Sequence, residues 1–193
     1  MPNTILLASA NPHKVEELKQ ILEPYGIELK STLDYPGGVD VEEDQPILEG
    51  NALKKARYWN LFSGLPALAD DTGLEVDALN GAPGVLSARY AGENVTYAQN
   101  VTKLLHELDG MNNRKARFRT VIAFVNGKSE HLFEGVCEGE IIHKPIGDKG
   151  FGYDPVFRPN GYQKTFAELH AEEKNRISHR GRALQKFLEY LKM

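Results

Sequence analysis

Two adjacent carboxylates at the end of a short apolar stretch are the residues best suited to chemistry in this 193-residue chain. Residues 66–69 predict a strand, Asp70 and Asp71 follow it, and a Thr-Gly pair then predicts a turn. Neighbouring strand side chains point to opposite faces, so we expect one carboxylate in a site and the other in a supporting position. A carboxylate there suits a divalent cation or activation of a water. The alternative is a merely polar turn.

A second candidate region joins the first expected strand to a helix. Residues 4–8 are apolar, Asn11 is a good N-cap, and Pro12 is a good first helical residue. Such a strand–loop–helix start offers backbone N–H groups to an anion. Lys14 lies in the first helical turn, where the helix dipole disfavours a cation unless a phosphate binds there. A simple solvated lysine is the alternative.

The start of the last expected helix has the same unusual charge. Ser178 is a plausible N-cap, which puts His179 and Arg180 in the first turn. Cations again lie at the positive end of a helix dipole. Two such helix starts suggest a shared anionic ligand, such as a phosphate or an electron-rich base edge.

An acidic loop and two lysines could complete a phosphate and cation site. Residues 39–45 form the loop, and Glu42, Glu43 or Asp44 could supply a second carboxylate to a cation, although a solvated acidic face is the alternative. Lys54 and Lys55 follow on a predicted helix. Adjacent helical side chains point about 100° apart, so we expect only one lysine to face a site.

The loop at residues 150–157 carries an aromatic side chain between two glycines. Glycine permits unusual backbone angles, and Phe151 held there could stack on a flat base. Asp154 could accept hydrogen bonds from a base or a sugar. The alternative is an aromatic loop that packs on the core.

The remaining pattern predicts an α/β protein. Residues 96–108 predict an amphipathic helix, and residues 116–125 predict a strand that the pair Asn126-Gly127 joins to the next one. Arg117 and Arg119 flank Phe118 in alternation, which could imitate an RNA-binding strand; a solvated strand face is the alternative.

Composition limits the classes of function. The chain has 41% hydrophobic and 26% charged residues and a net charge of −4, which argues against binding to a nucleic-acid polymer as the main role. Its single cysteine excludes an internal disulfide framework and a Cys-rich zinc site, and it suits a cytoplasmic location. No apolar stretch is long enough to cross a membrane.

Six motifs in order resemble those of the inosine/xanthosine triphosphate pyrophosphatases, and they extend over nearly the whole chain. The motifs are residues 9–14 (SANPHK), 49–56 (EGNALKKA), 69–74 (ADDTGL), 81–84 (GAPG) with 87–90 (SARY), 151–155 (FGYDP) and 177–181 (ISHRG). The resemblance implies one domain over residues 1–193, with an elongated mixed β-sheet flanked by helices and two lobes with a substrate cleft between them. It also implies a homodimer.

The resemblance further implies a reaction and its residues. Non-canonical purine nucleoside triphosphates (ITP, dITP, XTP and dXTP) would be hydrolysed with Mg²⁺ to the monophosphate and pyrophosphate, which cleanses the nucleotide pool. Glu43 and Asp71 would bind Mg²⁺, with Asp71 also the base for the attacking water. The substrate-binding residues would be Ser9, Ala10, Asn11, Pro12, His13, Lys14, Lys55, Thr72, Phe151, Gly152, Tyr153, Asp154, Lys174, His179 and Arg180.

The roles within this set follow position by position. Ser9 to Lys14 and Lys55 would hold phosphates, Phe151 would stack on the base, and Lys174, His179 and Arg180 would read its edge. Glu43 is preferred to Glu42 by its spacing from Asn51, and the choice of general base between Asp70 and Asp71 stays open. A nucleotide-binding module without catalysis is the alternative class.

Overall fold

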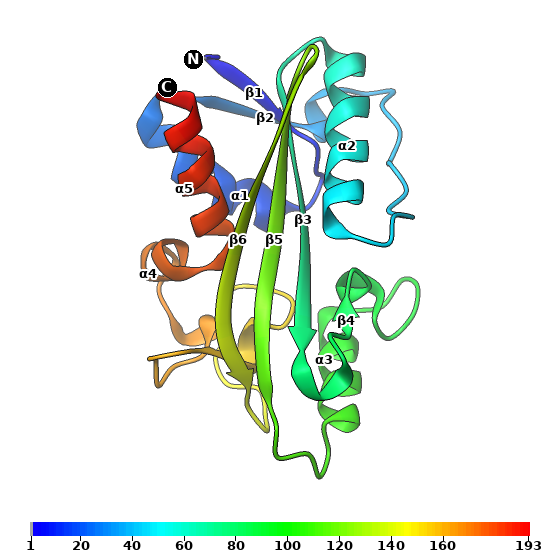
Figure 1. The fold of residues 1–193 in the computed structure, drawn as a ribbon, viewed down its shortest axis with the longest axis vertical. Coiled ribbons are helices and arrows are strands. Elements are labelled where there is room, and N and C mark those ends of the chain that lie inside the picture. Colours follow the sequence, from blue (N-terminus) through cyan, green and yellow to red (C-terminus); the bar gives the residue numbers. More distant parts are fainter. Residues whose placement is uncertain (1) are drawn as a thin grey trace. The chain divides into compact units, whose positions relative to one another are not determined.

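The computed structural model describes residues 2–193, which form two compact units (Figure 1). Unit 1 comprises the N-terminal segment up to Asp71, Thr120–Gly135 and Arg180–Met193. Unit 2 comprises Thr72–Arg119 and Val136–His179. Neither unit is a continuous piece of chain.

The secondary structure is a mixed β-sheet with helices, as the sequence predicts. The helices are α1 (Pro12–Leu22), α2 (Leu48–Ser63), α3 (Tyr97–Glu107), α4 (Ala171–Ile177) and α5 (His179–Leu191). The strands are β1 (Thr4–Leu7), β2 (Glu28–Ser31), β3 (Ala67–Val76), β4 (Pro83–Gly84), β5 (Lys115–Asn126), β6 (Ser129–Ile141) and β7 (Phe157–Pro159). Their order is β2-β1-β3-β5-β6-β7, with β4 paired to β3. Strand β1 pairs in parallel with β2 and β3, whereas β3–β4 and β6–β7 are antiparallel, so the α/β prediction is confirmed.

Unit 1 has its own hydrophobic core on one face of β1 and β3. Ile5, Leu7 and Leu68 pack there with apolar side chains of α1 and α5, among them Leu18 and Phe187. Figure 1 shows α1 and α5 together on one side of these strands and α2 on the other. Leu6 points away from that cluster and is also fully buried. The strand is therefore covered on both faces, as a continuously apolar strand predicts.

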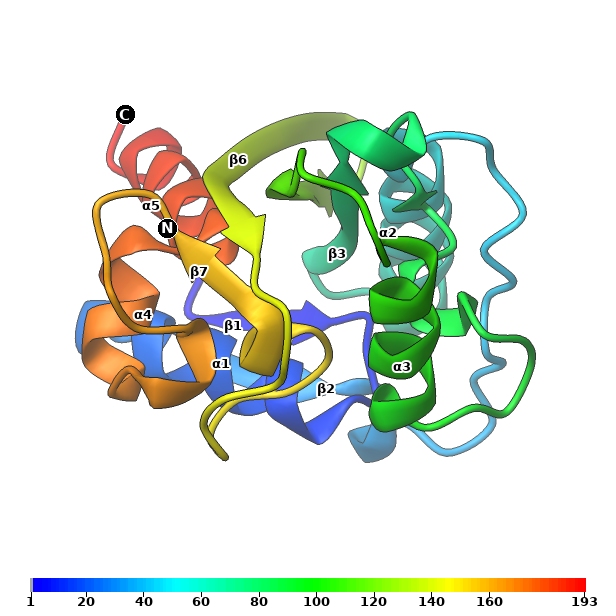
Figure 2. The same ribbon diagram turned by 90° about the horizontal axis from the view of Figure 1, so that it is seen from below.

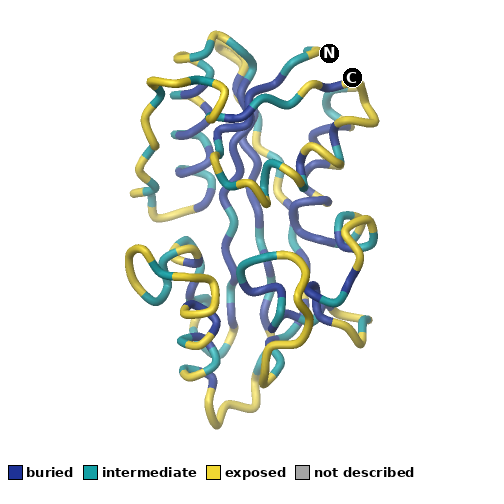
Figure 3. The backbone as a smooth tube through the Cα atoms, turned by 180° about the vertical axis from the view of Figure 1, so that it is seen from behind, coloured by how far each residue is buried: buried dark blue, intermediate teal, exposed yellow. Residues whose placement is uncertain are grey.

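Unit 2 has a separate core built on β5, β6, β7 and α3. Phe118 and Phe157 lie with ring centroids 4.7 Å apart, and Leu104 of α3 belongs to the same cluster. Strand β7 runs antiparallel beside the end of β6 (Figure 2). Two independent cores explain why the chain separates into two units. Figure 3 shows the buried residues along the strands and the exposed residues mainly in the loops.

Most local signals in the sequence are confirmed. Asn11 caps α1 with Pro12 at its first position, and the helix expected over residues 96–108 is α3, which Thr96 caps. Asn126 ends β5, and β6 begins two residues after Gly127. Strand β2 ends at Ser31, because a 3₁₀ turn over Thr32–Asp34, capped by the Ser31 hydroxyl, follows it directly.

The Thr-Gly turn expected after the two aspartates is wrong. Strand β3 continues through Thr72-Gly73 to Val76. Strand β4 pairs beside it, and a Cβ on Gly73 would lie 2.8 Å from the carbonyl oxygen of Gly84. Gly73 is therefore explained by the close approach of a neighbouring backbone, not by a turn.

The five helices are short or polar. Across residues 2–193, no helix has the length and hydrophobicity needed to cross a membrane.

Candidate functional site

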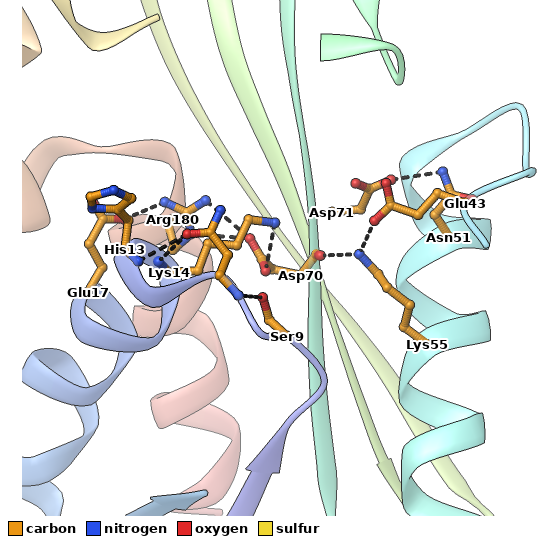
Figure 4. Close-up of polar contacts among 11 residues, drawn as sticks. Ser9, His13, Lys14, Glu17, Glu43, Asn51, Lys55, Asp70, Asp71 and Arg180 are labelled. Atoms are coloured by element: carbon orange, nitrogen blue, oxygen red, sulfur yellow. Dashed lines mark hydrogen bonds and ion pairs between the residues drawn. The ribbon is translucent and has the colours of Figure 1, made fainter. Parts of the chain in front are cut away.

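Asp70 and Asp71 point to different partners in unit 1, as strand alternation predicts. Both are buried, with exposed fractions of 1% and 4%. Asp70 faces the start of α1, whereas Asp71 faces α2 and accepts a hydrogen bond from the Asn51 amide at 3.0 Å (Figure 4). The two carboxylates therefore have distinct environments on one strand.

Asp70 is held by three cationic side chains. Its Oδ1 lies 3.1 Å from Lys14 Nζ, its Oδ2 accepts from Nε and Nη2 of Arg180 at 3.2 and 3.1 Å, and its backbone carbonyl accepts from Lys55 Nζ at 2.7 Å. Burial alone would raise the pKa of the Asp70 carboxyl, but the Lys14 and Arg180 charges hold it well below its usual range. Asp70 is therefore ionised at neutral pH.

The two cations at helix starts share one anion, and that anion is a side chain of the protein. Lys14 in the first turn of α1 and Arg180 in the first turn of α5 both contact Asp70. Arg180 also donates to Glu17 of α1. Burial opposes the charge of Arg180, but Glu17 and Asp70 raise the pKa of its guanidinium. The unfavourable helix dipoles are thus compensated without a bound ligand.

Asp71 has the opposite electrostatic character to its neighbour. Burial raises the pKa of Asp71 to about 6; Lys55 opposes this rise and the nearby charge of Glu43 reinforces it. Glu43 and Asp71 lie beside one another in Figure 4. A carboxyl that titrates near neutral pH suits a general base. The buried Asp71 and the half-buried Glu43 together also suit a cation.

Only one of the two α2 lysines faces this site, as expected. Lys55 is buried, and its Nζ donates to Glu43 Oε1 at 2.5 Å. Burial opposes its charge, but Glu43 and Asp71 raise the pKa of its ammonium. Lys54 points elsewhere and pairs with Asp44 at 2.8 Å. This contact places Glu43, rather than the exposed Glu42, beside the predicted phosphate-binding lysine.

In the loop before α1, the backbone N–H groups that could bind an anion are already hydrogen-bonded to side chains of the same segment. The backbone N–H groups of His13 and Lys14 donate to Asn11 Oδ1 at 3.0 and 3.4 Å, and that of Asn11 donates to Ser9 Oγ at 3.2 Å. Figure 4 shows Ser9, His13 and Lys14 on this segment. A phosphate would therefore meet the Lys14 ammonium directly but would compete with the N-cap for these amides.

The predicted base-binding loop forms its own cluster in unit 2. Asp154 Oδ2 accepts from the backbone N–H of Phe151 at 2.9 Å and from Lys174 Nζ at 2.7 Å. The Lys174 ammonium lies 5.2 Å from the Phe151 ring centroid. Gly150 has a φ of +70°, and a Cβ on it would lie 2.0 Å from Asp154 Oδ2. This geometry needs glycine and fixes the partly exposed Phe151 ring.

The other predicted residues of unit 2 occupy different places. His179 is buried and stacks on Phe118, with ring centroids 4.6 Å apart. Tyr153 is buried and donates its hydroxyl to the Ser87 carbonyl at 2.9 Å. Thr72 and Gly152 are partly exposed. In unit 1, Ala10, Pro12 and His13 are exposed around the capped turn.

The structure does not support the interpretation of residues 117–119 as an RNA-binding strand. Phe118 is buried in the core of unit 2, so it cannot stack on a base. Arg117 contacts the carboxylates of Glu75, Asp77 and Glu138 at 3.5, 3.0 and 3.1 Å. The solvated, charge-paired strand face is therefore the better description.

Two site residues were missed by the sequence reasoning. Asn51 was used only to choose between Glu42 and Glu43 and was given no role of its own. Its side-chain amide nevertheless donates to the Asp71 carboxylate and to the Gln45 backbone carbonyl. Glu17 was not considered, although it lies three residues after Lys14 and so on the same face of α1. That spacing was the available signal.

A pocket of about 280 Å³ lies elsewhere in unit 2, between the end of β6 and β7. Arg114, Lys144 and Arg158 are among its lining residues, and none of the predicted substrate-binding residues lines it. The predicted base site is therefore not this pocket.

A metal site in unit 1 would rest on two protein carboxylates. Within residues 2–193, no group of three or more His, Cys, Asp or Glu side chains is placed to hold a metal ion. Mg²⁺ usually binds through one or two carboxylates together with waters and substrate phosphates. Glu43 and Asp71 fit that pattern, since the charge of Glu43 disfavours the ionised form of Asp71 and a cation would offset that repulsion.

The fold and the unit 1 cluster together define an α/β protein in which two adjacent buried carboxylates lie among lysine and arginine side chains. The chain belongs to the Ham1 family, whose family model matches residues 5–190. The resemblance stated from the six motifs is thereby confirmed.

The proteins similar to this chain align with it over almost its full length. A dITP/XTP pyrophosphatase of Christiangramia forsetii is 47% identical over 187 residues, which cover 97% of this chain and 98% of that protein. One from Desulforamulus reducens is 51% identical, covering 97% and 94%. The solved structure of a HAM1 protein from Coxiella burnetii has a TM-score of 0.89 at 43% identity, and the match covers 98% of each chain.

Proposed function

We propose that this protein is a nucleoside triphosphate pyrophosphatase that hydrolyses dITP and XTP, together with ITP and dXTP, to the monophosphate and pyrophosphate. The observation that carries the proposal is the unit 1 cluster, in which Lys14 and Lys55 surround a pair of carboxylates with opposite pKa behaviour. The names of relatives about half identical to this chain support the substrate class.

The phosphates would bind to the lysines. Lys14 Nζ and Lys55 Nζ now contact Asp70 and Glu43, and both would exchange these contacts for triphosphate oxygens. Phosphoryl transfer depends mainly on positioning and on neutralising charge, and two lysines supply both. Glu43 and Asp71 would hold Mg²⁺, which neutralises further charge on the triphosphate when bound.

Asp71 would act as the general base. Its carboxyl is oriented by the Asn51 amide and titrates near neutral pH, so it can take the proton of an attacking water. Asp70 stays ionised between Lys14 and Arg180 and would support the phosphate-binding lysines instead. We therefore expect Asp71→Asn to abolish turnover and spare nucleotide binding.

The base would bind in unit 2 through Phe151 and Lys174. The Phe151 ring offers a stacking surface, and the Lys174 ammonium offers a donor to the 6-oxygen of hypoxanthine or xanthine. Adenine has an amino group at that position, itself a donor. A buried donor left unpaired costs about 1–3 kcal/mol, which disfavours ATP.

The proposal also includes the oligomeric state and the cellular location of the protein. A homodimer and a cytoplasmic location are typical of the class inferred from the motifs, and we propose both for this chain. Gel filtration with light scattering at micromolar concentration tests the dimer.

The experiment that tests the function is pyrophosphate release from ITP, XTP, GTP and ATP side by side, with Mg²⁺ and with EDTA. We expect fast release from ITP and XTP only, dependent on Mg²⁺, and none from the Asp71→Asn variant. Equal rates on all four nucleotides would contradict the account of base selection. Nucleotide binding without any pyrophosphate would favour the non-catalytic alternative.

A further inference from the structure

The side chain of Arg180 is buried between two carboxylates of unit 1. Its exposed fraction is 3%, that of Asp70 is 1% and that of Glu17 is 16%. Nε and Nη2 both donate to Asp70 Oδ2, and Nη1 donates to Glu17. Figure 4 shows the guanidinium directed at these two residues. Its donors are thus engaged on both sides by protein carboxylates.

Asp70 connects this guanidinium to the predicted phosphate-binding lysines. Arg180 occupies Oδ2 of Asp70, which leaves Oδ1 for Lys14 at 3.1 Å. Lys14 is the most exposed member of the group, with 18% of its side chain accessible. The group therefore has a buried, rigid end and a cation at its accessible end.

Charge balance explains what the guanidinium does for Lys14. Arg180 and Lys14 carry two positive charges, and Asp70 and Glu17 carry two negative charges. If Lys14 moves from Asp70 to a phosphate, Asp70 keeps two hydrogen bonds from Arg180. Without the guanidinium, the same move would take both cationic side-chain partners away from a buried carboxylate, which is strongly unfavourable.

We propose that Arg180 is a positioning residue that acts through Asp70: it fixes the carboxylate that orients Lys14 and keeps that carboxylate neutralised when Lys14 passes to a phosphate. The inference rests on the proposed function, because it assigns Lys14 to the triphosphate. It differs from the expectation that Arg180 reads the base edge, since here its effect on binding is independent of the base.

Inorganic triphosphate is the probe that separates these two roles, because it has phosphates and no base. Binding of triphosphate to wild type and to Arg180→Gln would be measured by calorimetry and by competition against ITP hydrolysis. We expect Arg180→Gln to weaken triphosphate binding and raise KM for ITP by the same factor, about 10- to 100-fold, as for other residues that orient a ligating group. The ratio of kcat/KM for ITP to that for GTP should not change.

If Arg180→Gln folds poorly, other substitutions at Arg180 and at its partner Glu17 test the same proposal. Arg180→Lys keeps the charge and should recover part of the triphosphate affinity. Glu17→Gln removes one partner of the guanidinium and should weaken triphosphate binding several-fold in the same direction. Arg182→Gln removes an exposed arginine two residues further along α5 and should leave triphosphate binding and KM unchanged.

The outcomes decide between the two roles. Triphosphate binding within twofold of wild type in Arg180→Gln, together with a changed ITP to GTP ratio, would overturn the proposal in favour of base reading. An equal loss in Arg182→Gln would overturn it in favour of a general charge effect. Absence of pyrophosphate release from wild type would contradict the proposed function alone, since the calorimetric comparison does not depend on turnover.

Discussion

Replacing Asp71 with asparagine should stabilise the metal-free protein, although it removes the proposed general base. The pKa of Asp71 is raised from 3.8 to about 6, so the folded state disfavours its ionised form. At about 1.4 kcal/mol per pH unit, this difference amounts to about 3 kcal/mol of lost stability above pH 6. Asparagine keeps the shape and can still accept from Asn51, and it carries no charge.

The sign of the pH dependence follows from the same values. Below about pH 3, Asp71 is protonated in both the folded and the unfolded state, and its burial then costs the wild type nothing through ionisation. As the pH rises from about 4 to about 6, the unfolded state ionises more readily and the wild type loses this stability. The advantage of Asp71→Asn should therefore be largest above pH 6, should be much smaller near pH 4 and should vanish below about pH 3.

Urea unfolding with EDTA at pH 8.0, 6.0 and 4.5, followed by far-UV circular dichroism, would measure the difference. For a chain of this size, about 3 kcal/mol corresponds to a rise in Tm of roughly 6–12 °C at pH 8. Asp70→Asn is the matched control, and it should destabilise because Arg180 and Lys14 lose their shared carboxylate. A loss of stability in Asp71→Asn at pH 8, or a gain independent of pH, would refute the reasoning.

Three further changes have expected outcomes. Phe151→Ala should raise KM for ITP by the equivalent of about 1–3 kcal/mol and leave inorganic triphosphate binding unchanged; an equal loss for both ligands would contradict stacking on the base. Lys55→Gln should reduce kcat/KM strongly, whereas Lys54→Gln, which removes an exposed ion pair, should leave the rate unchanged; steady-state kinetics on ITP compare them. Gly73→Ala should lower Tm, because its Cβ would meet the Gly84 carbonyl; a Tm equal to wild type would show that β4 can move away.

The local features of the fold could be predicted because each depends on a few neighbouring residues. The cap of α1 needs only Asn11 and Pro12, and the hairpin after β5 needs only Asn126-Gly127. The continuation of β3 past Asp71 could not be predicted in this way. It depends on pairing with β4, which places Gly84 against Gly73 from a distant part of the chain.

The candidate site shows the same limit. The alternation of side chains correctly separated Asp70 from Asp71, and the helix dipoles correctly marked Lys14 and Arg180 as cations that need an anion. Sequence reasoning expected that anion to be a ligand, because nothing local indicates that Asp70 lies beside a helix start 110 residues later. The spacing of Glu17 from Lys14 was a local signal, but nothing local indicates that Arg180 contacts it.

The discontinuity of unit 1 has a consequence for its synthesis. The chain passes between the two units four times, after Asp71, Arg119, Gly135 and His179. A contiguous gene fragment that encodes all of unit 1 therefore also encodes unit 2. Unit 1 begins before unit 2 in the chain and is completed after it, by Arg180–Met193. On the ribosome, Asp70 is synthesised long before α5, which carries its partner Arg180. Until α5 emerges, a nascent chain carries this carboxylate in an incomplete core, so truncation within α5 should leave unit 1 unable to close around it.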